Sequence, residues 1–233
     1  MLLRVNCLFD WFDIPDSDRA RAEQLSREAF EASKGMTHLN DYLALSAVLI
    51  RYRPCRIFEI GTYLGVTSDF FLRLLPDCEV VSIAYTGKIL SFLRKSYNNS
   101  GLSRKQIGSC VGADRRGRFH QICGDSHKLT AGSLTDKFGM FDMVFIDGDH
   151  CADGVRRDTA LAGSIIADNG LICWHDANPK DKYKEVRIYL EQELPMNAVA
   201  TMDDYFGGIS CWSKDIERRL LTSMKPLSQI SHT

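Results

Sequence analysis

A short apolar run that ends abruptly in ionisable side chains constrains the fold of this chain more than any other feature. Residues 143–146 read Met-Val-Phe-Ile, and Asp147, Asp149 and His150 follow within four positions. An unbroken apolar run of this length favours a strand buried on both faces of a parallel sheet. In open α/β sheets, ligands bind at the carboxyl ends of such strands. Charged groups there are costly to desolvate unless they bind or react with something, so the pattern predicts a functional site.

A second apolar run repeats this design. Residues 171–174 read Leu-Ile-Cys-Trp, and His175 and Asp176 follow directly. Core packing alone does not explain two apolar strands that each end in Asp and His. We therefore expect one active centre, formed where the ends of these two strands meet.

Strands and helices are expected to alternate along the chain. Apolar runs predict strands at residues 56–60, 79–83, 119–123, 143–146, 171–174 and 209–212. Helical periodicity and capping signals predict helices at residues 16–33, 37–52, 68–75, 88–97, 155–166 and 184–194. Such alternation is typical of a Rossmann-like α/β fold with a doubly wound, mostly parallel sheet. We expect a single domain over residues 1–233, with a helical cover at 1–54, a core at 55–213 and a polar tail at 214–233.

A glycine-bearing turn follows the first strand of this core. The strand at residues 56–60 carries Glu59 near its end, and Gly61 and Gly65 flank the turn to the next helix. Glycines let a backbone approach a ligand closely, and a helix N-terminus offers free N–H groups. The spacing differs from the G-x-G-x-x-G of dinucleotide-binding enzymes, which disfavours NAD. The turn indicates a nucleotide-binding unit, although the second strand ends at Ala84 without the acid that commonly holds a ribose.

The charge balance argues against polyanionic partners. The 233 residues carry a formal net charge of −1, which gives no electrostatic reason to expect nucleic acid or an anionic membrane. The eight cysteines are scattered without a C-x-x-C pair, and no apolar run approaches transmembrane length. We therefore expect a cytoplasmic protein of a reducing compartment that acts on a small molecule. The sequence leaves open whether it forms a homo-oligomer.

Several polar side chains outside these motifs are interpreted as structural or solvated. Arg115, Arg116 and Arg118 cluster in a polar segment, which predicts a solvated loop or helix face. His127 stands alone and is expected to be structural or solvated. Asp158 is assigned to the solvated face of a helix, because acidic side chains are mostly exposed.

Four motifs together resemble a known enzyme family. They are Glu59-Ile60-Gly61-Thr62-Tyr63-Leu64-Gly65, Gly124-Asp125-Ser126, Phe145-Ile146-Asp147-Gly148-Asp149-His150 and Trp174-His175-Asp176. Their order and spacing resemble class I S-adenosylmethionine (SAM)-dependent methyltransferases. The resemblance is strongest to the small bacterial branch that includes macrolide sugar O-methyltransferases and cephalosporin-hydroxylase-like proteins. It covers about residues 40–213, and the Ile-Asp-Gly-Asp-His motif with the downstream His-Asp is specific to that branch.

On these positions, the resemblance implies a SAM site. The methionine and ribose end is assigned to residues of the first turn: Glu59, Gly61, Tyr63 and Gly65. The adenine end is assigned to two residues that follow a later strand: Asp125 and Ser126. Asp147 also belongs to the implied cofactor site.

The resemblance also implies a divalent cation, with Mg²⁺ as the first expectation, and a general base. In metal-dependent relatives, an Asp that ends the central strand and an acidic pair that ends the next strand bind magnesium. The matching residues are Asp147, His175 and Asp176, so a histidine replaces one acid and a hard, oxygen-preferring cation is less favoured. His150 matches the base of the macrolide enzymes, and Asp149 is expected to support it or to bind substrate.

The expected reaction is methylation of a hydroxyl on a sugar or another small polar metabolite. The acceptor oxygen must lose its proton as it attacks, which a cation and a neutral imidazole promote. One alternative is a non-haem iron oxygenase that uses two histidines and a carboxylate, although it has no need of the glycine turn. A second alternative is a non-catalytic, cofactor-binding protein that has kept the fold, which the missing ribose acid keeps open.

Overall fold

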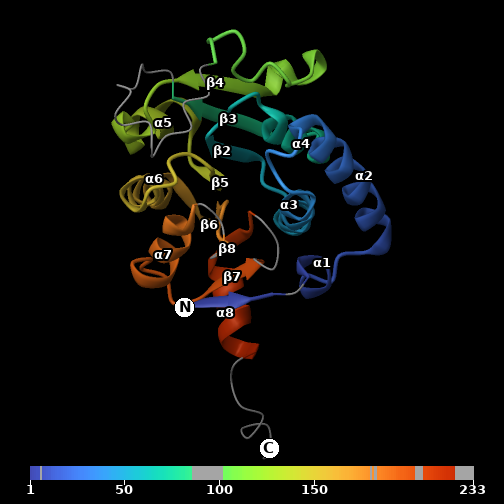
Figure 1. The fold of residues 1–233 in the computed structure, drawn as a ribbon, viewed down its shortest axis with the longest axis vertical. Coiled ribbons are helices and arrows are strands. Elements are labelled where there is room, and N and C mark those ends of the chain that lie inside the picture. Colours follow the sequence, from blue (N-terminus) through green and yellow to red (C-terminus); the bar gives the residue numbers. More distant parts are fainter. Residues whose placement is uncertain (6, 86–101, 179, 181–182, 203–206, 224–233) are drawn as a thin grey trace, which may run out of the picture.

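The computed structural model describes residues 1–233 except 6, 86–101, 179, 181–182, 203–206 and 224–233. In this described part of the chain, eight strands form one sheet that lies between two layers of helices (Figure 1). The strand order is β1-β7-β8-β6-β5-β2-β3-β4. Among these strands, only β8 is antiparallel to its neighbours, β6 and β7. The structure thus confirms the predicted α/β fold with a doubly wound, mostly parallel sheet.

The strands follow the apolar runs of the sequence. Their bounds are β1 Leu2–Arg4, β2 Arg56–Ile60, β3 Glu79–Ala84, β4 Phe119–Cys123, β5 Phe141–Ile146, β6 Ile166–Trp174, β7 Val199–Met202 and β8 Ile209–Trp212. All six predicted strands form, and β2, β4 and β8 have the predicted bounds. Strands β1 and β7, which are three and four residues long, are not among the predicted strands.

Helices cover both faces of the sheet (Figure 1). Their bounds are α1 Leu8–Trp11, α2 Asp16–Ser33, α3 Leu39–Tyr52, α4 Val66–Leu74, α5 Ala131–Phe138, α6 Ala152–Ile165, α7 Lys184–Gln192 and α8 Lys214–Ser223. Helices α5, α6 and α7 pack on one face, and α2, α3 and α4 pack on the other. The helix expected at residues 88–97 lies outside the described residues. Residues 214–223 form α8 instead of part of a polar tail, because Ile216 and Leu220, one helical turn apart, are buried in the core.

The central strand β5 fills two separate cores with alternate side chains. Met143 and Phe145 pack in the core on the α2–α4 side, and Val144 and Ile146 pack in the core on the α5–α7 side. None of the four is more than 4% exposed. The run is apolar throughout because successive side chains of a strand point to opposite faces, and here both faces are covered.

The register of the sheet brings the ends of β2, β5 and β6 into line. Ile60 pairs with Ile146, and Ile146 pairs with Trp174. Asp147 donates its backbone N–H to the Ile60 carbonyl at 2.8 Å, and His175 donates to the Ile146 carbonyl at 3.0 Å. Residues 61, 147 and 175 therefore leave the sheet side by side.

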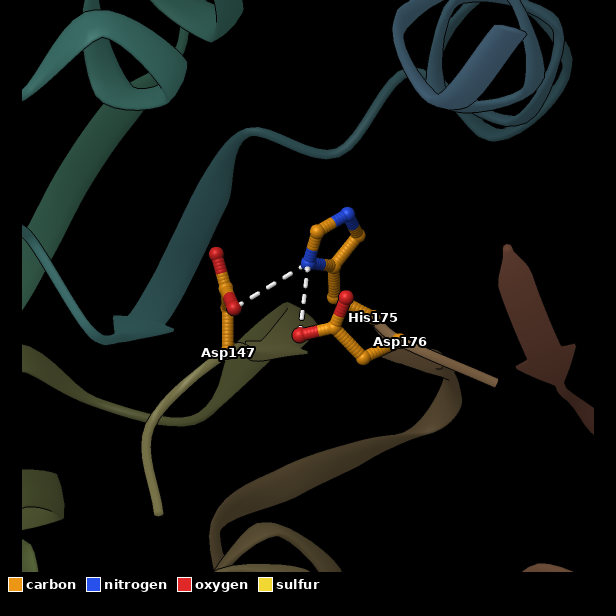
Figure 2. Close-up of side chains that lie close together, drawn as sticks. All are labelled: Asp147, His175 and Asp176. Atoms are coloured by element: carbon orange, nitrogen blue, oxygen red, sulfur yellow. Dashed lines mark hydrogen bonds and ion pairs between the residues drawn. The ribbon is translucent and has the colours of Figure 1, made fainter. Parts of the chain in front are cut away.

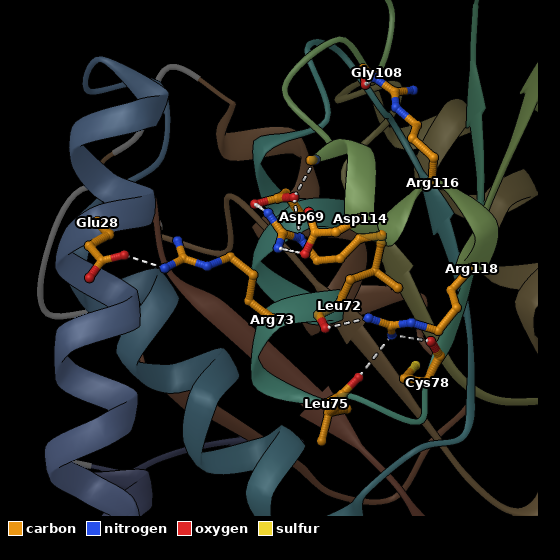
Figure 3. A network of polar contacts seen from close by, with 12 residues as sticks. Glu28, Asp69, Leu72, Arg73, Leu75, Cys78, Gly108, Asp114, Arg116 and Arg118 are labelled. Carbon is orange, nitrogen blue, oxygen red and sulfur yellow. Dashed lines mark hydrogen bonds and ion pairs between the residues drawn. The ribbon is translucent and has the colours of Figure 1, made fainter.

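An arginine-rich turn attaches the segment before β4 to helix α4 (Figure 3). Arg115 Nε donates to Asp69 Oδ1 at 2.8 Å, and Arg116 donates to the Gly108 carbonyl at 2.7 Å. Arg118 donates to three main-chain carbonyls at the end of α4 and beyond it: those of Leu72, Leu75 and Cys78. The segment forms a 3-10 turn at the surface with no buried residue, as the prediction of a solvated face has it, and Arg118 in addition satisfies carbonyls that a helix end leaves without partners.

The described helices are not suited to span a membrane, and the cysteines of the described residues form no disulfide bonds. Among the residues that the structure describes, no helix has both the length and the apolar character needed to cross a bilayer. All eight cysteines are free thiols. Cys78, Cys173 and Cys211 are buried, where a thiol packs as a small apolar group.

Candidate active site

A cavity of about 890 Å³ opens at the carboxyl edge of the sheet. The segments that follow β2, β3, β4, β5 and β6 line it, together with the connection between α2 and α3. Pockets that hold small ligands measure roughly 300–1,000 Å³, so the volume is sufficient for a nucleoside-sized cofactor. The predicted site residues that line the cavity are Gly61, Tyr63, Gly65, Asp125, Ser126, Asp147, Asp149, His150, His175 and Asp176.

The first turn lies so close to neighbouring backbone that it admits no side chain at its glycines. Gly61 has φ +112°, and a Cβ there would lie 1.9 Å from the carbonyl oxygen of Asp147. Gly65 has φ +82°, and a Cβ there would lie 2.7 Å from Cα of Gly108. Tyr63 accepts the Gly108 N–H at its carbonyl at 3.0 Å. The glycines therefore let two segments of protein backbone meet, and the cavity lies beside the turn that results.

Glu59, which the resemblance assigns to the cofactor site, lies beneath the cavity and is not among the residues that line it. Its side chain is fully buried and accepts hydrogen bonds from the hydroxyls of Ser68 and Ser82. Its Oε1 has no hydrogen-bond partner among the described residues. Burial raises the pKa of Glu59 to about 7 in spite of these two hydroxyls. Adjacent side chains of a strand point to opposite faces, so Glu59 and Ile60 lie on different faces of β2. On its own face, the Glu59 carboxyl group contacts α4 through Ser68 and β3 through Ser82, beneath the turn.

Asp125 and Ser126 lie at the other end of the cavity, after β4. Asp125 Oδ1 accepts the His127 N–H at 3.0 Å, which caps a short 3-10 turn. His127 also lines the cavity, and its Nε2 lies 3.6 Å from Asp158 Oδ1. Asp158 is 1% exposed, and burial raises its pKa to about 6. The prediction of a solvated Asp158 is wrong, because the turn after β4 packs over this side of α6.

Asp147, His175 and Asp176 point toward one another at the ends of β5 and β6 (Figure 2). His175 Nδ1 lies 3.1 Å from Asp147 Oδ1 and 3.5 Å from Asp176 Oδ2. One ligand atom from each residue lies within 4.8 Å of the others, which is a spacing that can hold a metal ion. Asp176 has φ +56°, an uncommon conformation for a residue other than glycine and one that is concentrated at functional sites. The structure thus brings together the three residues predicted as metal ligands.

His150 lies beside this cluster and is held on two sides. Its ring stacks on Tyr183 with 3.9 Å between ring centroids and 21° between planes. Its Nε2 lies 2.7 Å from Asp176 Oδ2 and 3.5 Å from Asp147 Oδ1. Burial alone lowers the pKa of His150, but the neighbouring carboxylates of Asp147 and Asp176 outweigh burial and raise the pKa to about 10. In this arrangement His150 holds its proton at neutral pH.

Asp149 does not have the role expected of it beside His150. Its Oδ1 accepts the Cys151 N–H at 3.0 Å, and its Oδ2 lies 3.2 Å from the Cys151 thiol. The carboxylates that raise the pKa of His150 are Asp147 and Asp176 instead. The reason is that Asp149 turns toward the start of α6. Because Asp149 also lines the cavity, a contact with substrate stays a prediction.

Sequence reasoning missed two buried side chains of α3 that line the cavity. These are Asp41 and Tyr42, both 0% exposed. His175 Nε2 lies 3.0 Å from Asp41 Oδ2, so α3 is part of the site as well as a cover. A signal was present, because Asp41 falls on the same helical face as Leu45 and Val48. An acid among apolar positions at helical spacing indicates a buried partner.

Charges within the cluster shift its pKa values in opposite directions. Burial alone lowers the pKa of His175, but the charges of Asp176, Asp147 and Asp41 raise it well above its usual value. Burial alone raises the pKa of Asp176, but the charge of His175 and the hydrogen bonds from both histidines lower it far more. The pKa of Asp147 is lowered as well, chiefly by the charge of His175 against the effect of burial, so Asp147 and Asp176 are ionised and attract positive charge into the space between them.

Comparisons with known proteins bear on this site. Residues 58–177, slightly more than half of the chain, match a family model described as "Methyltransferase domain". A comparison with curated proteins found no match.

Solved structures share the fold at low sequence identity. A putative caffeoyl-CoA O-methyltransferase from Staphylococcus aureus has a TM-score of 0.57 and 18% identity, over 82% of this chain and 92% of that one. The SAH-bound methyltransferase PaMTH1 from Podospora anserina has a TM-score of 0.53 and 20% identity, over 87% and 89%. MycE of the mycinamycin biosynthetic pathway, in complex with Mg, SAH and mycinamycin VI, has a TM-score of 0.54 and 18% identity. That match covers 81% of this chain but 53% of MycE, so the chain spans about half of MycE.

Proposed function

Because the chain belongs to this family of methyltransferase domains and is thus a SAM-dependent methyltransferase, we propose that it methylates a hydroxyl of a sugar or another small polar metabolite. The observation that carries this proposal is an imidazole, His150, 2.7 Å from Asp176 in a cavity that also borders the glycine turn. A base and a methyl donor would therefore meet in one space. Because the chain belongs to a methyltransferase family, the alternative of a non-haem iron oxygenase is set aside.

The cavity fits SAM along the strand ends. Gly65 is the N-cap of α4, whose first N–H groups are free to bind the carboxylate of a methionine moiety. Asp125 and Ser126 border the opposite end, where the adenine moiety would lie. Tyr85 lines the cavity where an acid commonly holds the ribose. Bound SAM supplies an electrophilic methyl group, so the main tasks of the protein are to orient both substrates and to exclude water.

Asp147, His175 and Asp176 fit a divalent cation. Their facing atoms are carboxylate oxygens and one imidazole nitrogen, all of which bind cations. Two ionised carboxylates this close together are stable only with positive charge between them. These three residues would hold the ion, which supplies a Lewis acid that lowers the pKa of the acceptor hydroxyl.

His150 is placed to accept the proton of the acceptor. Its pKa of about 10 reflects the attraction of Asp147 and Asp176 for the imidazolium. Positive charge bound to those carboxylates weakens this attraction and lowers the pKa of His150. The neutral imidazole that results can then take a proton near neutral pH.

A transfer assay tests the proposal. SAM with a labelled methyl group is incubated with a panel of sugars and small polyols, with and without a strong chelator. We expect the label to enter an acceptor, the chelator to suppress transfer, and Asp147→Asn to lower turnover by roughly 10²-fold or more while calorimetry finds SAM affinity unchanged. Asp153→Asn, on the exposed face of α6, is the control. SAM binding without transfer to any acceptor would favour the non-catalytic alternative, and activity indifferent to chelators would remove the metal.

A further inference from the structure

His175 replaces an acid of the metal-binding pattern, and a second carboxylate from a distant helix holds it. Asp41 lies at the start of α3, 134 residues before His175 in the chain. It is fully buried, and its Oδ2 lies 3.0 Å from His175 Nε2. This hydrogen bond thus links the helical cover to the end of β6.

Hydrogen-bond donors hold both oxygens of the Asp41 carboxylate. Its Oδ1 accepts the Gly208 N–H at 2.9 Å, and its Oδ2 accepts the His38 N–H at 3.1 Å. Gly207 packs against it so closely that a Cβ there would lie 2.5 Å from Oδ2. Three donors thus hold the two oxygens of Asp41 in place, one on Oδ1 and two on Oδ2.

This arrangement decides which nitrogen of His175 faces the cluster as a ligand. Asp41 Oδ2 already accepts the His38 N–H, so its carboxyl oxygen acts as the acceptor and the His175 Nε2 that faces it acts as the donor and carries a hydrogen. Nδ1 faces Asp147 and Asp176 at 3.1 and 3.5 Å, where a bound cation would take the place of the Nδ1 proton. A carboxylate behind an imidazole in this way fixes its orientation and makes the opposite nitrogen a better metal ligand.

We propose that Asp41 positions His175 as a nitrogen ligand, and that the site thereby prefers a borderline cation such as Fe²⁺, Co²⁺ or Zn²⁺ more strongly over Mg²⁺ than an all-oxygen site does. The inference rests on the metal part of the proposed function. Imidazole suits these ions, whereas Mg²⁺ prefers carboxylate and water oxygens. Asp41 is a positioning residue, because it acts only through His175.

Pulsed EPR of the unmodified protein loaded with Mn²⁺ alone tests the nitrogen ligand directly. We expect ¹⁴N coupling from a bound imidazole, lost in His175→Asn, which keeps an amide oxygen near the place of Nδ1 and has no atom at Nε2. Mn²⁺ that binds without ¹⁴N coupling would overturn this inference and leave the proposed methyl transfer intact. If neither Mn²⁺ nor Mg²⁺ binds saturably, both the metal part of the proposed function and this inference fail, while SAM-dependent transfer is judged by its own assay.

Calorimetric titration with Co²⁺ and with Mg²⁺ tests the part played by Asp41. Asp41→Asn should weaken Co²⁺ binding about 10- to 100-fold, as loss of such a supporting carboxylate does, and weaken Mg²⁺ binding less. His38→Ala is the matched control: it removes the side-chain half of the α3 capping box and keeps the backbone N–H that Asp41 accepts, so the Co²⁺/Mg²⁺ preference should stay unchanged. Equal losses for both ions in Asp41→Asn, or the same shift in His38→Ala, would assign Asp41 a purely structural role. Should Asp41→Asn fail to fold, a Co²⁺/Mg²⁺ preference in His175→Asn equal to that of the unmodified protein would still overturn the proposal.

Discussion

The glycine turn and the histidine–aspartate cluster lie at neighbouring strand ends but are built by different means. The turn is made of backbone, since Gly61 lies against the Asp147 carbonyl and Gly65 lies against Gly108. The cluster is made of side chains that arrive from β5, β6 and α3, with Asp41 and His175 meeting across 134 residues.

This difference predicts two kinds of sensitivity. A backbone turn depends on shape, so an added methyl group damages it. A charged cluster depends on proton and cation occupancy, so substitutions that preserve shape still alter its chemistry.

The largest expected effect is steric and lies in the turn. Gly61→Ala places a Cβ 1.9 Å from the Asp147 carbonyl oxygen at φ +112°. We expect the free energy of unfolding to fall by roughly 3–5 kcal/mol, because backbone must move on both sides of the contact. Urea unfolding measures it. Gly163→Ala, in α6 with open space around the site, should instead stabilise the protein by about 0.5–1 kcal/mol. Equal stabilities of the two variants would contradict the backbone account of the turn.

The second effect is chemical and lies in the cluster. His150→Gln should lower turnover by roughly 10²–10⁴-fold, because the positioned base is lost while SAM affinity changes little. Initial rates and calorimetry together measure this. His120→Gln, on β4 and away from the cavity, serves as the control. Near-normal turnover of His150→Gln with an unchanged pH profile would place the base elsewhere.

The third prediction concerns the pH dependence of stability that Glu59, buried beneath the turn, should cause. Its pKa of about 7 lies above the ordinary 4.5, so the folded state holds the proton more tightly than the unfolded state. The resulting stability is complete below about pH 4.5 and is lost as the pH rises through about 7. Glu59→Gln, which is neutral at every pH, should therefore gain up to about 3 kcal/mol relative to the unmodified protein between pH 4.5 and pH 8. Parallel pH dependences in urea unfolding would contradict a raised pKa.

The smallest effect concerns the ring that supports His150. Tyr183→Leu removes the ring that stacks on His150 at 3.9 Å. The stacking interaction that holds the imidazole in place is worth about 0.5–1.5 kcal/mol, so its loss should lower turnover roughly 3- to 10-fold. Tyr183→Phe keeps the ring, so its rate should stay closer to that of the unmodified protein. If both variants lose the same activity, the hydroxyl matters and the stacking does not.

Local pattern determined most of the fold. The strands at residues 56–60, 119–123 and 209–212 form within the predicted bounds, because an apolar run between turn residues carries its own signal. The same logic located the active edge, since Asp147, His150, His175 and Asp176 each follow such a run and all line the cavity.

Tertiary structure alone decided which side chains face one another. Glu59 looked like a cofactor ligand and Asp158 like a solvated residue, yet both are buried with raised pKa values. Asp41 looked like part of a peripheral cover, yet it holds His175. Their environments depend on partners far away in the chain, and a periodic pattern reports only the burial of a residue's own neighbours. The sequence therefore determines which strands end in reactive groups, whereas the packing of α3, α4 and α6 on the sheet determines the charge, orientation and partner of each group.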